Sequence, residues 1–320
     1  MTIVIGLTPN ERGAAAVHLG SMLARSTRDD LVVVTVVPTP WPPNPYRPDA
    51  EYLAYQAKAA EEALAVARSR IGPDLSVELV SHHAQSVSTG LLEVARDRDA
   101  TLVALGSSSM GVLGSVSLGG VAERIVYSSD IPVTLAPKGF DTGTVDARVS
   151  RITVAFGRAD RDSDLLLTAA SVAKDIGASL RVACLAVRPM TVAVGSIEPE
   201  AEDLVVDEWA RGLERDIAQA LRRTDGSSVG TQVDIVVGQG TSWADALADI
   251  PWGAGEVLAI GTSSSAVSRF FLGSHASKIV RNSPVPVYLM PRSLPMPEPG
   301  DGRTPDPSQG FPGDERAIDH

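Results

Sequence analysis

Apolar and polar positions follow two alternating patterns in the second half of the chain. Short, almost entirely apolar runs are separated by segments in which apolar residues recur every three or four positions. One such segment, residues 165–176, is followed by Gly177, a residue typical of helix ends. Continuous apolar runs are typical of parallel strands covered on both faces. The pattern therefore predicts a parallel sheet with strands at residues 152–156, 179–187, 231–237, 256–261 and 285–290.

The first half of the chain repeats this arrangement. Gly106-Ser-Ser-Ser returns as Gly261-Thr-Ser-Ser, and Ile131-Pro-Val returns as Val285-Pro-Val, both at an offset of about 150 residues. Solenoid repeats have shorter periods of roughly 20–50 residues, so this repeat indicates a duplicated domain. The strands of the first copy are expected at residues 3–7, 31–37, 76–82, 101–105 and 131–135.

The two copies divide the chain into four parts. The first domain is expected at residues 1–138 and the second at residues 151–292, with a connector rich in Gly, Thr and Asp at residues 139–150. Residues 293–320 combine proline, glycine and acidic residues with few large apolar ones, so they bury too little apolar surface to become ordered. We expect a disordered tail there.

Composition and charge exclude several classes of function. The 320-residue chain carries a net charge of −11 without a basic stripe, so a nucleic-acid partner is not expected. No apolar run approaches the roughly 18 residues of a membrane span, and the N-terminus lacks the pattern of a signal peptide. The single cysteine, Cys184, cannot form an internal disulfide. We therefore expect a cytoplasmic protein that does not interact with membranes.

A run of small residues follows the fourth expected strand of each copy. Gly106 and Gly261 end these strands, and Gly119-Gly120 or Gly273-Ser274 opens the next helix. Glycine at a strand end allows a sharp turn, and a helix N-terminus presents free N–H groups and the positive end of its dipole. Both features would lie beyond the carboxyl ends of the strands, where open α/β sheets bind ligands. The pattern favours a polyphosphate.

Taken together, the chain resembles a tandem universal stress protein over residues 1–292. The resemblance implies two five-stranded parallel-sheet domains of strand order 3-2-1-4-5, which pair through their last strands, and a homodimer of the tandem chain. It also implies that ATP, an adenine nucleotide, binds at a Gly-x2-Gly-x9-Gly-(Ser/Thr) motif. The implied binding residues are Gly6, Thr8, Gly106, Ser107, Ser108, Ser109, Gly119 and Gly120 in the first copy, and Gly261, Thr262, Ser263, Ser264, Gly273, Ser274 and His275 in the second.

Both copies depart from the motif of the family. Ser109 and Ser264 stand at the middle glycine, Gly120 stands at the hydroxyl residue, and Gly273-Ser274 comes one residue early. The aspartate that ATP-binding members usually carry after the first strand is absent, since Thr8 and Gly157 occupy that place. Two hypotheses therefore stay open, namely a nucleotide-binding regulator and a nucleotide-free scaffold for dimerisation or partner docking.

Catalysis has little support in the sequence. The chain has no Gly-x4-Gly-Lys-(Ser/Thr) phosphate loop, and no base and nucleophile converge near the glycine loops. We expect a protein that is not an enzyme, and slow nucleotide hydrolysis is the weakest of three hypotheses. His82-His83 has no further ligands at metal-binding spacing, so no metal site is expected, and Cys184 is expected to be buried.

Overall fold

The computed structural model describes most of both copies and their connector. The described residues are 1–8, 13–39, 50–108, 113–157, 159–187, 208, 211–219, 233–265 and 268–291. The predicted tail and the candidate residue Ser109 lie outside these ranges. The two predictions made for them, a disordered tail and a contact with phosphate, stay predictions.

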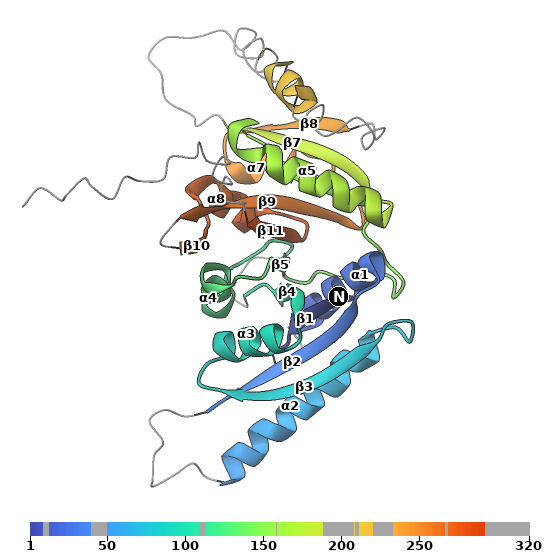
Figure 1. The fold of residues 1–320 in the computed structure, drawn as a ribbon, viewed down its shortest axis with the longest axis vertical. Coiled ribbons are helices and arrows are strands. Elements are labelled where there is room, and N and C mark those ends of the chain that lie inside the picture. Colours follow the sequence, from blue (N-terminus) through green and yellow to red (C-terminus); the bar gives the residue numbers. More distant parts are fainter. Residues whose placement is uncertain are drawn as a thin grey trace, which may run out of the picture.

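Strands and helices alternate through each copy (Figure 1). The first copy consists of β1 (Thr2–Gly6), α1 (Ala14–Thr27), β2 (Asp30–Pro38), α2 (Ala50–Arg70), β3 (Val77–Ala84), α3 (Val87–Asp97), β4 (Ala100–Gly106), α4 (Gly120–Ser128) and β5 (Val133–Ala136). The second consists of β6 (Arg151–Ala155), α5 (Ala159–Ile176), β7 (Ser179–Val187), a helical stretch at residues 211–219, β8 (Asp234–Gly240), α7 (Trp243–Ala248), β9 (Glu256–Ser265), β10 (Ser268–Phe271), α8 (Ser274–Asn282) and β11 (Val287–Pro291).

Each copy has the strand order that the family resemblance implies. The order is β3-β2-β1-β4-β5 in the first copy and β8-β7-β6-β9-β11 in the second, with all neighbours within a copy parallel. The 3-2-1-4-5 order is therefore confirmed in both. The second copy also has β10, which pairs with β9 in antiparallel orientation and was not predicted.

The two copies share one continuous sheet, because their last strands pair. β5 and β11 run antiparallel, with Leu135 opposite Val287 and Val133 opposite Leu289. The Thr134 hydroxyl donates to the Val287 carbonyl at 3.0 Å, which ties the strands further. In Figure 1 the two strands lie side by side at the centre of the molecule. The predicted pairing through the last strands is confirmed.

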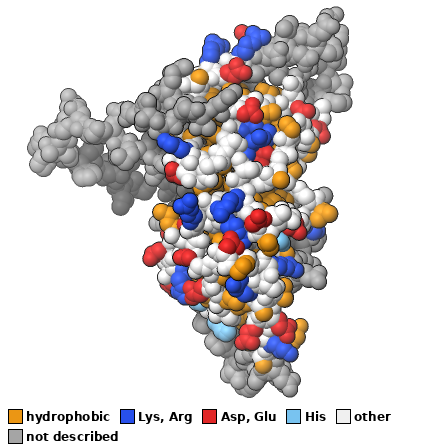
Figure 2. All heavy atoms as spheres, turned by 90° about the vertical axis from the view of Figure 1, so that its right-hand side faces the viewer, with side chains coloured by type: hydrophobic (Ala, Val, Ile, Leu, Met, Phe, Trp, Pro, Cys, Tyr) orange, Lys and Arg blue, Asp and Glu red, His pale blue; other side chains and the backbone are white. Residues whose placement is uncertain are grey.

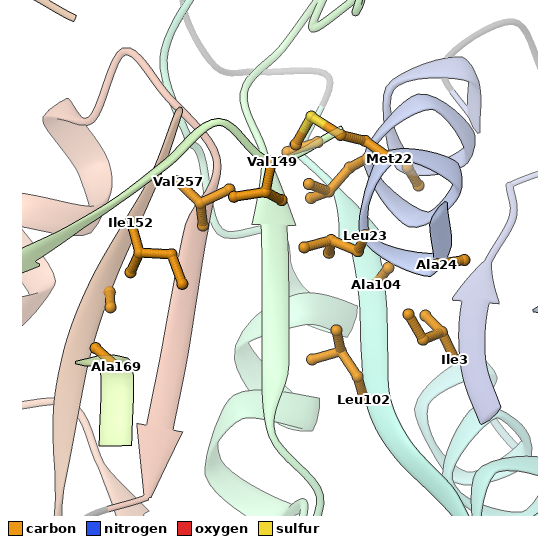
Figure 3. Packing of buried hydrophobic residues seen from close by; sticks show 14 of the residues in the cluster. Ile3, Met22, Leu23, Ala24, Leu102, Ala104, Val149, Ile152, Ala169 and Val257 are labelled. Carbon is orange, nitrogen blue, oxygen red and sulfur yellow. The ribbon is translucent and has the colours of Figure 1, made fainter. Parts of the chain in front are cut away.

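Helices cover both faces of the sheet. Side chains from α1, α2, α5 and residues 211–219 belong to one buried hydrophobic cluster, part of which is shown in Figure 3. Side chains from α3, α4, α7 and α8 belong to a second cluster on the opposite face. The doubly wound architecture thus continues from one copy into the next, as expected for buried parallel strands.

Equivalent helices end in a left-handed residue in both copies. Gly177 follows α5 with φ of +71°, so the predicted helix stop is confirmed. After α1 the same conformation is taken by Arg28, with φ of +62°, and its N–H donates to the Ala24 carbonyl. Glycine adopts this conformation without steric cost, whereas a residue with a Cβ is strained by about 1–2 kcal/mol.

The connector is fastened to the first copy. The Val149 N–H donates to the Ser26 hydroxyl at 2.8 Å, and the Arg148 guanidinium donates to the Arg25 carbonyl. Asp141 also lies 3.5 Å from His18 of α1. Residues 139–150 therefore run along the end of α1 before β6 begins.

Candidate functional site

Apart from Gly6 and Thr8, the predicted binding residues that the structure describes lie at two places, one in each copy. We call residues 106–108 and 113–120 the first loop site, and residues 261–265 and 268–275 the second loop site. Each lies where a central strand, β4 or β9, ends and the helix α4 or α8 begins. This is the edge of an open α/β sheet at which ligands bind.

One predicted residue in each loop site ties the sheet together. The Ser107 hydroxyl donates to the Ala136 carbonyl of β5 at 2.7 Å, and the Thr262 hydroxyl donates to the Met290 carbonyl of β11 at 3.1 Å. Thr262 is fully buried. The hydroxyls therefore fasten the fourth strand of each copy to its fifth.

The chain folds back on itself after each of these hydroxyls. In the first copy the Ser108 N–H donates to the Ser117 carbonyl at 2.8 Å. In the second copy Ser263 pairs with Phe271 in the antiparallel β9–β10 hairpin. The prediction of a loop at Gly261-Thr-Ser-Ser is therefore wrong in its local structure, because these residues continue strand β9. Backbone pairing across the hairpin, which local composition does not report, extends the strand.

The helices at the loop sites begin without a side-chain cap. Gly119 precedes α4 and Gly273 precedes α8, and neither helix receives a capping hydrogen bond from a side chain. By contrast, Ser86 and Ser242 cap α3 and α7 with their hydroxyls. The first N–H groups of a helix have no partner within it and need a cap, water or a ligand. The starts of α4 and α8 thus leave donors available for an anion.

Packing and backbone conformation do not require glycine at the start of α8. Gly273 has φ of −56°, and a Cβ built there would meet no atom of the described residues within 4 Å. A Cβ on Gly120 would also stand in open space, whereas one on Gly119 would lie 3.2 Å from the Ser108 Cβ. Gly273 and Gly120 therefore leave room for a group that approaches the helix N-terminus closely.

The ends of the first strands differ from the loop sites. A Cβ on Gly6 would lie 2.7 Å from Leu105 Cδ2 and 3.0 Å from Leu91 Cδ1, so the packing of these two buried leucines by itself favours glycine there. Thr8 is exposed. In the second copy the Gly157 N–H donates to the Asp162 carboxylate at 2.9 Å, and Asp162 is buried. That carboxylate therefore occupies the N–H group at the end of the strand.

His275 lies beside an aromatic ring that sequence reasoning missed. The His275 and Trp243 ring centroids are 5.1 Å apart, and the Lys278 ammonium lies 5.9 Å from the Trp243 ring. His275 and Lys278 are exposed. The Ser242-x-x-Asp245 capping box in the sequence could have revealed this neighbour. It marks the start of α7 and places Trp243 in the first turn of that helix, beside α8.

The remaining candidates have structural surroundings. Cys184 is buried, and burial raises the pKa of its thiol to about 12, so the thiol stays protonated. His82 Nε2 lies 2.8 Å from the Glu93 carboxylate. Within the described ranges, no three His, Cys, Asp or Glu residues group to hold a metal ion, and no helix is long and apolar enough to cross a membrane. On the face in Figure 2, acidic and basic side chains are interspersed.

Comparison with known proteins gives a consistent result. The model of the Universal stress protein family matches the chain twice, at residues 1–137 and 149–291. Universal stress proteins of Mycobacterium tuberculosis and Mycobacterium bovis are each 34% identical to it over 297 residues, which cover 91% of this chain and 100% of each relative. The crystal structure of a universal stress protein from Archaeoglobus fulgidus covers 91% of this chain and 98% of its own, with a TM-score of 0.56 and 17% identity.

Proposed function

The chain belongs to the universal stress protein family, and from this premise we propose that it is a stress-response regulator that binds an adenine nucleotide, ATP, and acts by binding. The second loop site is the proposed binding site, and the first is its weaker counterpart. The domains proposed to carry these sites are residues 1–138 and 151–292. We also propose a cytoplasmic location.

The start of α8 carries this proposal. Gly273 leaves open space beside uncapped N–H groups, at a position where neither packing nor backbone conformation requires glycine. A phosphate in that space would accept hydrogen bonds from the first turn and lie at the positive end of the helix dipole. Ser274 and His275 stand in the same turn and add a hydroxyl and an imidazole.

The side chains around α8 favour the second copy over the first. Trp243 and Lys278 place an aromatic ring and an ammonium group next to His275. The positions equivalent to Trp243 and His275 in the first copy are Val87 and Val121. Lys278 has a cationic counterpart in Arg124, so the copies differ in the aromatic ring, which suits stacking, and in the imidazole, and neither valine offers these interactions.

A nucleotide-free scaffold is the second candidate, and two observations favour it. The Ser107 and Thr262 hydroxyls are occupied by backbone carbonyls, and the Asp162 carboxylate already accepts a hydrogen bond from the Gly157 N–H after β6. Since β5 and β11 pair within the chain, a homodimer of the tandem chain would use other surfaces.

Calorimetric titration with ATP tests the proposal. We expect Gly273→Val to weaken ATP binding, because the branched side chain fills the open space beside the N–H groups. Gly119→Val is the matched change in the first copy and should affect binding less. Both variants should retain the circular dichroism of the parent. Gly273→Val should also retain the unfolding midpoint, whereas Gly119→Val should lower it, because its Cβ would lie 3.2 Å from the Ser108 Cβ. Equal affinity of parent and Gly273→Val would exclude the second loop site.

Restoring the family motif gives a second test. Ser264→Gly combined with Gly157→Asp should tighten ATP binding if the site is weakened. Because a new carboxylate at position 157 would face Asp162, the variant should also carry Asp162→Asn. Absence of binding heat with every form, together with no nucleotide detected by mass after denaturing the purified protein, would leave the scaffold.

A further inference from the structure

A cavity lies at the seam between the two copies, away from both loop sites. Its volume is about 590 Å³, within the roughly 300–1,000 Å³ that is usual for small-molecule sites. We call it the seam cavity. None of its lining residues belongs to either loop site. It lies on the face of the sheet covered by α1 and α5, and Tyr288 and Met290 of the central strand β11 contribute to it.

Both copies supply apolar walls to the seam cavity. Ile3 and Leu102 come from the first copy, and Ile152 and Val257 come from the second. Figure 3 shows the side chains of Leu23 and Leu102 on one side of the seam and those of Ile152 and Val257 on the other. Val149, at the end of the connector, lies between them. The cavity therefore exists because the copies pair, and neither copy forms it alone.

Apolar residues form most of the lining of the seam cavity. Ser26, Thr27 and Thr101 also line it, but their hydroxyls already donate to backbone carbonyls. Tyr288 contributes a hydroxyl that makes no hydrogen bond with the described residues. Burial, reinforced by the negative charge of Asp29, raises the pKa of Tyr288 to about 12, so the hydroxyl stays neutral. The charged groups along the lining are Arg28, Asp29, Asp175 and the N-terminal ammonium of Met1. Their two positive and two negative charges give a carboxylate or sulfonate no net attraction that would offset the hydration it loses in the apolar part of the cavity.

We propose that the seam cavity binds an uncharged, largely apolar small molecule with one hydroxyl or carbonyl group that hydrogen-bonds to Tyr288. The apolar walls recognise the body of the molecule, and burial of its apolar surface supplies the affinity. The Tyr288 hydroxyl orients it, because a phenol both donates and accepts. Since both copies form the walls, the ligand also holds the copies together.

Fluorescence of N-phenylnaphthylamine, an uncharged apolar probe, tests the seam cavity on the full-length chain. We expect its emission to rise on binding and to be displaced by decanol more readily than by decanoate. Val172→Trp should weaken probe binding by more than about tenfold, because Val172 lines the cavity and the indole would fill it. Ser171→Trp is the matched control, since it places the same ring on an exposed position of α5 outside the lining.

Tyr288→Phe separates the hydrogen bond from the cavity. The variant should bind the probe like the parent but bind decanol about two- to tenfold more weakly. Unfolding midpoints of all variants confirm that the fold is intact. Equal probe affinity of Val172→Trp and Ser171→Trp would overturn the proposal. Tighter probe binding after truncation at Arg292 would also overturn it, because the cavity would then belong to the chain's own C-terminal segment. Loss of probe binding as the chain self-associates would overturn it as well.

Discussion

The two copies bury the same position of the sheet in opposite ways. In the first copy the adjacent strands β1, β2 and β4 place Val4, Val32 and Ala100 there, all buried. In the second copy Thr153, Arg181 and Glu256 take the corresponding places on β6, β7 and β9. Arg181 is 2% exposed and Glu256 is 1% exposed. One fold therefore accommodates an apolar core or an ion pair at the same place.

The ion pair belongs to a hydrogen-bond network. An Arg181 Nη lies 2.5 Å from Glu256 Oε1, and Arg181 Nε donates to the Thr153 hydroxyl at 3.1 Å. The Thr153 hydroxyl in turn donates to Glu256. Burial lowers the pKa of the Arg181 guanidinium, whereas the charge of Glu256 raises it. A buried charge is tolerated when it is paired and hydrogen-bonded in this way.

The covering helices explain the difference. α3 has 11 residues, whereas the equivalent α7 has 6 and is followed by an irregular segment at residues 249–255. That segment places backbone groups over the sheet, and Arg181 donates to the Pro251 carbonyl at 3.0 Å while Glu256 accepts from the Gly253 N–H at 2.8 Å. Apolar side chains could not satisfy these groups. A shorter helix is thus compensated by charged side chains beneath it.

Breaking the ion pair should have the largest effect. Glu256→Ala leaves Arg181 charged and buried, so we expect a loss of about 3–5 kcal/mol in the free energy of unfolding. Denaturant titration measures it. Ala100→Ser, at the corresponding position of the first copy, should cost much less because it leaves no charge unpaired.

Replacing the network by the apolar residues of the first copy sharpens this comparison. The triple variant Thr153→Val, Arg181→Val, Glu256→Ala should be more stable than Glu256→Ala but less stable than the parent, because Pro251 and Gly253 lose their partners. A triple variant as stable as the parent would show that the irregular segment does not need the ion pair.

The helix ends offer a smaller contrast. Gly177→Ala should cost about 1–2 kcal/mol, since φ is +71° there. Arg28→Gly, at the equivalent end of α1, should raise stability by about 0.5 kcal/mol, as relief of strain exceeds the added entropy of the unfolded chain. Thermal unfolding of the two variants measures both. A loss of stability in Arg28→Gly would contradict the strain argument.

Removing the serine at the start of a helix should lower the free energy of unfolding by about 1 kcal/mol in α3 and α7, which have a side-chain cap, but not in the loop-site helix α8. Ser242→Ala and Ser86→Ala each remove a hydroxyl cap and should lower the free energy of unfolding by that amount. Ser274→Ala should have little effect, because α8 has no side-chain cap to lose.

Hydrogen bonds from Thr241 and Ser242 lower the pKa of Asp245, so its stabilising contribution is present near neutral pH and is lost as the pH falls through this lowered value.

Removing the C-terminal segment should have the smallest effect. Residues 293–320 are rich in proline, glycine and acids, and truncation after Ser293 should leave the melting temperature within about a degree of the parent. A decrease of several degrees in differential scanning calorimetry would show that the segment contributes to the folded core.

The sequence by itself determined the duplication, the α/β class and the end of α5 at Gly177. It also identified the loop-site helix starts, because Gly119-Gly120 and Gly273-Ser274 occupy matching places in the two copies. The strand order and the pairing of the last strands came from the family resemblance. The duplication, the α/β class and the helix ends depend on local periodicity and on repeated motifs, and both can be read directly from the order of residues along the chain.

Only the tertiary structure decided the features that depend on distant residues. The β9–β10 hairpin, the Arg181–Glu256 pair and the Trp243–His275 contact join segments separated along the chain, and the seam cavity requires walls from both copies. The periodicity of each segment reports that a face is buried, but it does not report what covers that face. Arg181 and Glu256 are charged, and charged residues are usually exposed. Their burial is tolerated because each neutralises the charge of the other and nearby backbone groups complete their hydrogen bonds, and only the tertiary structure shows these partners.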